Sequence, residues 1–254
     1  MKTNTPSLWQ NILPLKTGKH HKYHYGHALI YGAPQLTGAS SLAAGACARI
    51  GAGLTTLIAP TQTDTLYRTI LPPHIMVRSA NDIKRDDSRI TARLYGPGGI
   101  TEQPDFTIEN SAVILDADAL KTLPARLATN YALTPHQGEF DRAFPTLKGT
   151  REQRTQAAAD KMQCIIVLKG ETTLIAAPNQ DIIQNTHATP WLATAGSGDV
   201  LAGIITGLAA QNMPLREACA AAVWIHGQCA HNFGNHLVAS DLITEIPRTM
   251  KQFL

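Results

Sequence analysis

The chain of 254 residues is poor in charged side chains, which make up 16% of it, against about 25% in ordinary globular proteins. Hydrophobic residues account for 44%, enough for a packed core, so a disordered chain, a coiled coil and a collagen-like chain are excluded. The formal net charge is only +3, and no lysine or arginine stripe accompanies it. We therefore expect no nucleic-acid partner.

Long apolar runs and paired cysteines are also missing. Arg49 and Asp199 interrupt the two longest apolar stretches, so no membrane span of roughly 20 residues is expected. The first residues contain neither an apolar segment nor a cleavage site typical of a secretory signal. No two cysteines form a C-x-x-C pair, and all are expected to be reduced and buried: Cys47, Cys164, Cys219 and Cys229. These features predict a cytoplasmic protein.

Several catalytic signatures are absent. The chain contains no G-x-x-x-x-G-K-[ST], G-x-G-x-x-G, G-x-S-x-G or H-E-x-x-H pattern, which excludes a P-loop NTPase, a simple Rossmann dehydrogenase, a hydrolase with a nucleophile elbow and a zincin. One histidine group has ligand-like spacing but no cysteine or aspartate partner, so no metal site is expected there: His20, His21, His24 and His27. His226 and His231 do not share an i, i+4 face and are interpreted as helix packing or surface residues.

The remaining pattern alternates strands and helices without repeats or linkers, which predicts one domain over residues 1–254. A strand at 28–31, an alanine-rich helix at 40–50 and a strand at 54–59 form a β-α-β unit, which implies parallel strands. Further strands are predicted at 112–115, 132–134 and 165–168, a hairpin at 173–177 and 181–185, and helices at about 200–210 and 215–231. The prediction is an α/β fold with a mostly parallel sheet and helices on both faces.

In such sheets ligands bind beyond the carboxyl ends of the strands, and unusual residues follow four of the predicted strands. These segments are Gly32-Ala33-Pro34, Asp116-Ala117-Asp118, His136-Gln137-Gly138-Glu139 and Lys169-Gly170. Their positions predict a common site.

The sharpest local signal is Gly196-Ser197-Gly198-Asp199, followed by an apolar pattern that predicts a helix beginning near Asp199. Glycines allow the backbone to approach a ligand closely, and the first amides of a helix form a phosphate site. An acid there could accept a proton from a substrate hydroxyl. The alternative is a tight turn whose acid complements the helix dipole.

Four weaker signals have structural alternatives. The Lys169–Thr173 segment could hold phosphate or form an ordinary turn. One of Asp116 and Asp118 is expected to be functional, while Asp118 could instead cap a helix. His136 could bind a ligand, and Glu139 could hold a Mg²⁺-bound water or cap the next helix. Gly96-Pro97-Gly98-Gly99 is a turn that could approach a ligand or be a plain loop.

Taken together, these segments resemble the ADP-dependent NAD(P)H-hydrate dehydratase family of the ribokinase-like superfamily. The resemblance runs from about Lys22 to Pro247 and is carried by LTGASSLAAGACARIGAGLTTLIAP, YGPGG, VILDADAL, LTPHQGEF, VLKGETTLIAAP, ATAGSGDVLAGIITGL and ASDLITEIP. It implies a ribokinase-like three-layer α/β sandwich. It also implies repair of the 6S hydrates NADHX and NADPHX, with ADP as co-substrate, to give the reduced dinucleotide, AMP and phosphate.

The resemblance also implies roles for individual residues. Those for the hydrate are Ala39, Gly98, His136 and Asp199, with Asp199 as the catalytic base. Those for the nucleotide are Lys169, Gly170, Glu171, Thr172, Thr173 and Gly198. Mg²⁺ and a homotetramer are further implications, with no metal-binding residue assigned.

The chain departs from the family pattern at three places. Ser197 stands where threonine is usual, Trp191 stands where glycine is common, and the stretch between Gly99 and Ala112 is short, which predicts that a helix there is missing or reduced. Two other functions stay open: a ribokinase-like kinase for a small alcohol such as a vitamin precursor, and a non-catalytic adenylate-binding sensor. The His136 and Lys169 segments favour the dehydratase over the kinase, and the intact Asp199 turn argues against the sensor.

Overall fold

The computed structural model describes residues 1–16, 18, 21–84 and 87–254. In these residues a mixed sheet of ten strands has the order β1-β10-β9-β8-β7-β6-β5-β2-β3-β4. All neighbouring strands are parallel except the pairs β8–β9 and β9–β10. The strands are β1 (Lys2–Thr3), β2 (His27–Tyr31), β3 (Leu54–Ile58), β4 (Ile75–Arg78), β5 (Ala92–Tyr95), β6 (Ala112–Leu115), β7 (Tyr131–Leu133), β8 (Ile165–Leu168), β9 (Thr173–Ala176) and β10 (Ile183–Asn185).

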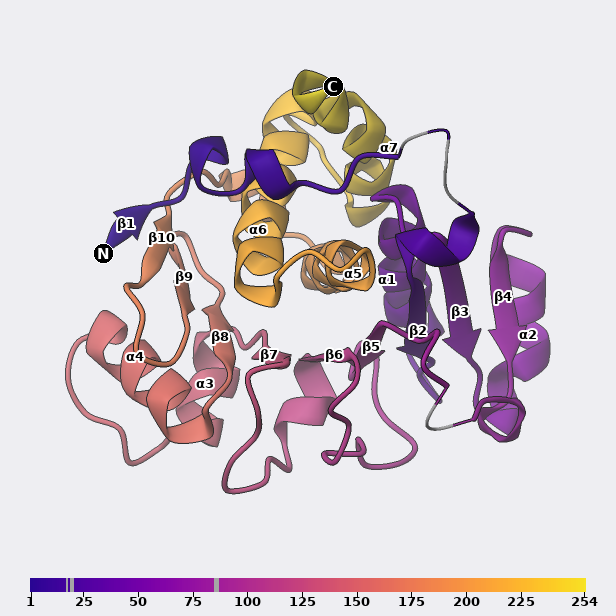
Figure 1. Ribbon diagram of the computed structural model, residues 1–254, viewed down its shortest axis with the longest axis horizontal. Helices are drawn as coiled ribbons and strands as arrows, with labels where there is room; N and C mark the ends of the chain where they lie inside the picture. Colours follow the sequence, from indigo (N-terminus) through magenta and orange to yellow (C-terminus); the bar gives the residue numbers. More distant parts are fainter. Residues whose placement is uncertain (17, 19–20, 85–86) are drawn as a thin grey trace.

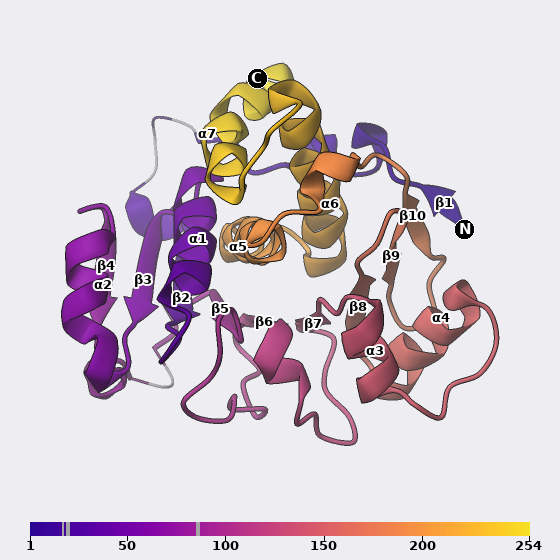
Figure 2. The same ribbon diagram turned by 180° about the vertical axis from the view of Figure 1, so that it is seen from behind.

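Helices cover both faces of this sheet, as Figures 1 and 2 show from opposite sides. Helices α1, α5, α6 and α7 lie on one face, and α3 and α4 lie on the other, while α2 packs against the edge strand β4. Their bounds are α1 (Thr37–Arg49), α2 (Asp64–Ile70), α3 (Gln137–Ala143), α4 (Arg151–Met162), α5 (Ser197–Ala210), α6 (Leu215–Phe233) and α7 (Ala239–Met250). The predicted three-layer α/β sandwich is confirmed.

The strand side chains divide between two hydrophobic cores, because successive residues of a strand point to opposite faces. On β5 and β6, Leu94 and Ile114 join the core beneath α1, α5 and α6. Their neighbours Tyr95 and Leu115 join the second core with α3 and α4. The central strands are therefore buried on both sides, as expected for a parallel sheet.

Helix α5 is buried nearly all round, and glycines let it lie against α1. A Cβ atom on Gly203 would lie 2.2 Å from the carbonyl oxygen of Ala43, and one on Gly207 would lie 2.3 Å from Cγ2 of Ile50. No larger side chain fits between backbones this close. This contact fixes the position of α5 along α1.

The predicted elements are confirmed to within a few residues, including the hairpin β9–β10 and the long helices α1, α5 and α6. Helix α5 begins at Ser197, two residues before the predicted start at Asp199, because Gly196 makes the turn into it. The prediction of a missing helix is also confirmed, since residues 96–111, all described, contain none. Among the described residues no helix is long and apolar enough to cross a membrane.

Candidate active site

The predicted site residues lie at the carboxyl edge of strands β5, β6, β7 and β8, which are neighbours in the sheet. The first turn of α5 lies at this edge, since a Cβ atom on Gly198 would lie 3.4 Å from Nζ of Lys169, which follows β8. Gly196 precedes the helix with a φ of 87°, a left-handed conformation that favours glycine. The turn therefore directs the first amides of α5 and the carboxylate of Asp199 toward the ends of the strands, as a phosphate site requires.

Asp199 is half-buried and has an unusual protonation equilibrium. Burial raises its pKa to about 6; the carboxylates of Asp116 and Glu139 act in the same direction, and the Lys169 ammonium opposes them. At neutral pH the side chain is mostly ionised, and it is a stronger base than an ordinary aspartate. A half-buried carboxylate with this pKa is suited to accept a proton from a substrate.

Lys169 forms a buried ion pair with Asp116. Its Nζ lies 2.8 Å from Oδ1 of Asp116, and the side chains are 18% and 3% exposed. The hydroxyl of Thr134 donates to the same carboxylate oxygen at 2.7 Å. Burial lowers the pKa of Lys169, but the carboxylates of Asp116, Glu139 and Asp199 together outweigh burial and leave that pKa raised. The lysine is therefore a permanent cation at the strand ends.

The two aspartates after β6 have different environments. Asp116 holds Lys169, whereas Asp118 forms an ion pair with Lys121 at 2.8 Å, and its side chain is 41% exposed. The short 3₁₀ helix Ala117–Leu120 begins before Asp118, so the interpretation of Asp118 as a helix cap is wrong. Asp116 is thus the aspartate that belongs to the site.

The Lys169 ammonium also reaches the turn of α5, because a Cβ atom on Gly198 would lie 3.4 Å from its Nζ. The structure therefore joins two signals that the sequence placed separately, the Lys169 segment and the Gly196–Asp199 turn. A cation, helix amides and a carboxylate base meet at this point.

His136 lies beside Lys169 through a parallel bridge, in which the Lys169 amide donates to the carbonyl of Pro135 at 2.8 Å. The Nδ1 atom of His136 caps α3 by accepting from the amides of Gly138 and Glu139 at 3.0 and 3.3 Å. The Glu139 carboxylate accepts from the His136 amide at 2.8 Å, so the capping interpretation of Glu139 is confirmed. With Nδ1 as an acceptor, the proton of a neutral His136 ring is on Nε2.

The predicted nucleotide segment, Lys169–Thr173, forms the turn between β8 and β9. Gly170 and Glu171 are exposed, Thr172 is half-buried, and Thr173 is buried as the first residue of β9. The Thr173 hydroxyl donates to the carbonyl of Gly170 at 3.3 Å. The exposed backbone at Gly170 leaves room for a ligand to approach.

Arg151, which sequence reasoning missed, supports this turn from the start of α4. Its guanidinium donates to the carbonyls of Leu168 and Lys169 at 3.0 and 3.2 Å, and also to that of Thr172. Burial lowers its pKa, but arginine keeps its charge. No local motif marks Arg151, because its role depends on the packing of α4 against β8.

Ala39 and Gly98 meet where the Gly96–Gly99 turn contacts α1. Gly98 has a φ of 80°, and a Cβ atom there would lie 2.3 Å from the carbonyl oxygen of Leu36 and 3.0 Å from Cβ of Ala39. The Ser40 hydroxyl donates to the carbonyl of Pro97 at 2.9 Å. A Cβ atom on Gly96 would lie 1.7 Å from the Asp116 carbonyl oxygen. The turn is therefore wedged between α1 and the segment that carries Asp116.

The helix-packing interpretation of His226 is confirmed, although sequence reasoning missed its link to this site. It lies on α6, buried beneath the first turn of α5, with Nε2 3.2 Å from Oγ and 3.0 Å from the carbonyl oxygen of Ser197. Burial lowers its pKa to about 4, so the ring is neutral at physiological pH. His226 supports the turn that carries Asp199.

No group of three or more His, Cys, Asp or Glu side chains that could hold a metal ion occurs in the described part of the chain. Of the histidine group near the amino terminus, His20 lies outside the described residues, and Nε2 of His27 lies 2.8 Å from the Thr56 hydroxyl. The carboxylates at the strand ends suit a Mg²⁺ ion that arrives with phosphate groups. In proteins this ion is commonly bound by one or two carboxylates together with substrate phosphates and water.

Comparison with known proteins identifies relatives of this chain. The model of a family described as NAD(P)H-hydrate dehydratase matches residues 27–252. An ADP-dependent (S)-NAD(P)H-hydrate dehydratase of Neisseria meningitidis serogroup B is 36% identical, over 89% of this chain and 83% of that protein. Other curated relatives are bifunctional NAD(P)H-hydrate repair enzymes, and the chain spans about half of their length.

Solved structures agree with this relationship. An ADP/ATP-dependent NAD(P)H-hydrate dehydratase from Bacillus subtilis, co-crystallised with ATP and Mg²⁺, has a TM-score of 0.83 and 31% identity, with 100% of this chain and 99% of that chain covered. A ribokinase from Thermotoga maritima has a TM-score of 0.58 and 13% identity over 89% of this chain and 99% of that chain. The ribokinase likeness shows the fold alone.

Proposed function

Since this chain belongs to the NAD(P)H-hydrate dehydratase family, we propose that it is an ADP-dependent (S)-NAD(P)H-hydrate dehydratase, a hydro-lyase. It restores NADH or NADPH from the 6S hydrate and converts ADP to AMP and phosphate. The observation that carries the proposal is the meeting of Lys169, Gly198 and Asp199 at the strand ends. This arrangement combines phosphate binding with a base of suitable pKa.

The first step is transfer of the β-phosphoryl group of ADP to the hydroxyl on carbon 6 of the hydrated ring. Asp199 accepts the hydroxyl proton while the oxygen attacks phosphorus, and AMP leaves with the electrons of the broken P–O bond. The amides from Gly196 to Gly198 and the Lys169 ammonium stabilise the charge on the transferring group. The ion pair with Asp116 holds this ammonium in place.

The second step is elimination. Hydroxide is a poor leaving group, whereas phosphate is a good one. The lone pair of the ring nitrogen expels phosphate from carbon 6, and the resulting iminium ion loses the proton from the adjacent carbon. The carbon–carbon double bond of the dihydropyridine is thereby restored, so the overall reaction balances without a redox cofactor.

The predicted site residues divide between the two ligands. We assign the hydrate to Ala39, Gly98, His136 and Asp199, and the nucleotide to Lys169, Gly170, Glu171, Thr172, Thr173 and Gly198. In support, Gly98 contacts Ala39, His136 pairs with Lys169, and Gly170 is exposed. When bound with the nucleotide, Mg²⁺ would be held mainly by phosphate oxygens and would neutralise their charge.

The deciding experiment follows recovery of the reduced-nicotinamide absorbance band. Purified protein is mixed with the 6S hydrate of NADH and Mg²⁺, with ADP in one cell and ATP in another. Recovery of the band with one AMP formed per NADH in the ADP cell supports the proposal. A flat trace despite nucleotide binding would favour the non-catalytic sensor, and a phosphorylated small alcohol would favour the kinase.

The role of Asp199 is tested with Asp199→Asn, which keeps the shape of the side chain and removes the base. We expect unchanged thermal stability and nucleotide affinity, with turnover reduced by about 10²-fold or more. Turnover near that of the wild type would remove Asp199 from the mechanism.

We also propose that residues 1–254 act as one domain and assemble as a homotetramer in the cytoplasm. The family resemblance supports the assembly, which light scattering of the purified protein measures directly. A monomer mass at working concentration would contradict it.

A further inference from the structure

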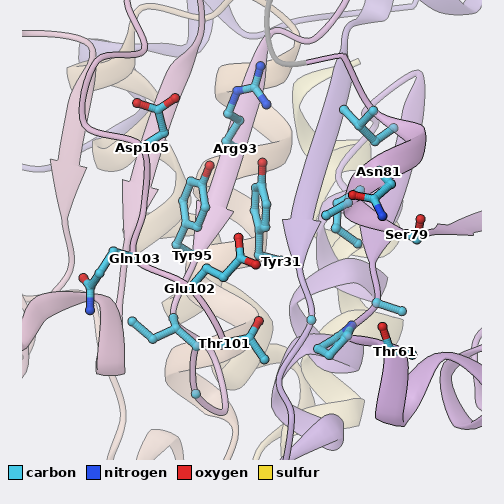
Figure 3. A pocket seen from close by; sticks show the side chains of 18 of the residues that line it. Tyr31, Thr61, Ser79, Asn81, Arg93, Tyr95, Thr101, Glu102, Gln103 and Asp105 are labelled. Carbon is cyan, nitrogen blue, oxygen red and sulfur yellow. The ribbon is translucent and has the colours of Figure 1, made fainter.

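A cavity of about 450 Å³ lies on the face of the sheet opposite α1 and α5, outside the site described above (Figure 3). Strands β2 and β5 form part of its wall, and the helix-free segment 96–111 and the segment 79–83 border it. This volume lies within the range of roughly 300–1,000 Å³ typical of small-molecule sites.

Two stacked tyrosines provide an aromatic wall. The rings of Tyr31 and Tyr95 are parallel within 15°, with centroids 3.9 Å apart. Tyr95 is 4% exposed, whereas Tyr31 is half-buried, and in Figure 3 its ring stands between Tyr95 and the segment carrying Ser79 and Asn81. A planar heterocycle beside Tyr31 would extend this stack.

Polar groups on either side of the wall match the parts of a nucleoside. Asn81 offers an amide that can both donate and accept hydrogen bonds, as the edge of a purine base requires, and Ser79 offers a hydroxyl. Glu102 lies below the two rings in Figure 3 and carries a carboxylate, while Asp105 lies on the side of Tyr95, where its Oδ1 accepts from the amide and hydroxyl of Thr107 at 3.0 and 2.8 Å. Carboxylates accept hydrogen bonds from ribose hydroxyl groups.

The charge at this cavity disfavours a phosphate on the ribose. Arg93 also lines it, but that residue is 1% exposed on the sheet, and its Nε donates to the Ser111 hydroxyl at 3.3 Å. The charged residues in the described lining are Arg93, Glu102 and Asp105, which sum to −1. In dinucleotide sites an acidic residue suits a free 2′-hydroxyl, whereas a 2′-phosphate calls for an arginine.

The cavity adjoins the active site through the Gly96–Gly99 turn. Gly99 lines the cavity, while its neighbour Gly98 contacts Ala39 at the opposite side of the turn. A Cβ atom on Gly99 would lie 4.0 Å from a carboxylate oxygen of Asp118, which follows β6. The strand-end site and the cavity therefore share this turn as a common border.

We propose that this cavity binds the adenosine end of the hydrated dinucleotide and that it makes the enzyme prefer NADHX to NADPHX. The inference rests on the proposed function, and it adds the recognition of the distal half of the substrate. The base stacks on Tyr31 and bonds with Asn81, while the exposed Glu102 carboxylate accepts from the ribose hydroxyl groups.

The test reverses the charge of Glu102, whose exposed side chain makes Glu102→Lys compatible with folding. The ratio of kcat/KM for NADHX to that for NADPHX should fall about tenfold through changes in KM, because a rim charge contributes to binding and not to the chemical step. Glu109→Lys is the matched control, since Glu109 is exposed in the same segment but does not line the cavity.

A binding measurement separates this inference from the proposed function. Titration calorimetry with NADH or NADPH, with ADP present at saturation, measures the affinity for the dinucleotide in the absence of turnover. We expect tighter binding of NADH, a loss of that preference in Glu102→Lys and about tenfold weaker binding of both in Asn81→Ala. Absent turnover with this binding pattern would refute the dehydratase alone. Normal turnover with KM and binding values unchanged in both variants would overturn the cavity proposal alone.

Discussion

The Nε2 atom of His226 lies 3.0 Å from the carbonyl oxygen of Ser197, the first residue of α5. The contact joins a buried, neutral histidine of α6 to the turn that presents Asp199, and the Ser197 hydroxyl lies within 3.2 Å of the same nitrogen. The position of the proposed base thus depends on a histidine that lies 29 positions after Ser197 in the sequence.

Replacing His226 should change both stability and its pH dependence. His226→Phe leaves the Ser197 groups without this partner and should cost about 1–3 kcal/mol of unfolding free energy. In the wild type the pKa is about 4 in the folded state and 6.5 in the unfolded chain, so the unfolded state binds more protons between these values. The free energy of unfolding should therefore fall as the pH decreases through this window. In His226→Gln this free energy, measured by chemical denaturation, should depend less on pH. An unchanged slope in His226→Gln would show that His226 does not carry this pH dependence.

Asp199 should determine the acidic limb of the pH–rate profile. Because its pKa is raised to about 6 in the ligand-free site and the ionised form is the base, kcat/KM should decrease as the pH falls through about 6. The measurement is kcat/KM for the hydrate, with ADP at saturation, between about pH 3 and pH 8. A limb near pH 4, where an unperturbed aspartate titrates, would show that Asp199 is not the limiting base.

The Lys169–Asp116 pair should show strong coupling between its members. Lys169→Met leaves the Asp116 carboxylate buried without its cation, which should cost about 3–5 kcal/mol and abolish most turnover. Lys169→Met combined with Asp116→Asn removes both charges and should recover much of the stability but not the activity. Denaturant unfolding and turnover assays on the four proteins of this cycle measure the two effects separately. Equal losses of stability in the single and double variants would contradict the coupling.

Gly98 should tolerate no side chain. In Gly98→Ala the new Cβ would lie 2.3 Å from the Leu36 carbonyl oxygen at a φ of 80°, so the turn must move away from Ala39. We expect a lower melting temperature and a raised KM for the hydrate, with less effect on the affinity for ADP. Gly38→Ala is the control, because no atom lies within 4 Å of its Cβ position in the first turn of α1. A KM equal to that of the wild type would separate Gly98 from substrate binding.

Local sequence signals predicted the turns and strand ends that the structure brings together at this candidate site, because these features depend on short-range chemistry. The glycines around Ser197 and the acid after them mark a helix start whatever the rest of the chain does. The parallel order of the strands followed from the β-α-β pattern, and it placed His136 and Lys169 at one edge.

The missed features all depend on distant packing. The sequence does not show which of Asp116 and Asp118 faces Lys169, because this depends on where the chain turns after β6. Arg151 begins a polar helix that carries no motif, and its contacts with the carbonyls of β8 exist only in the folded chain. Strand β5 was missed because Arg93 interrupts its apolar pattern, although that side chain is buried on the sheet.

The start of the chain affects how the molecule meets its neighbours. Strand β1 pairs with β10. The Asn4 side chain, which follows β1, donates hydrogen bonds to Oδ1 of Asn185 at 2.9 Å and to the carbonyl of Ala220 at 2.8 Å. An open strand edge is a template on which another chain can add and aggregate. Because β1 occupies the outer side of β10, no other chain can pair with β10 there. The edge strand on that side is β1 itself, which has only two residues, Lys2–Thr3.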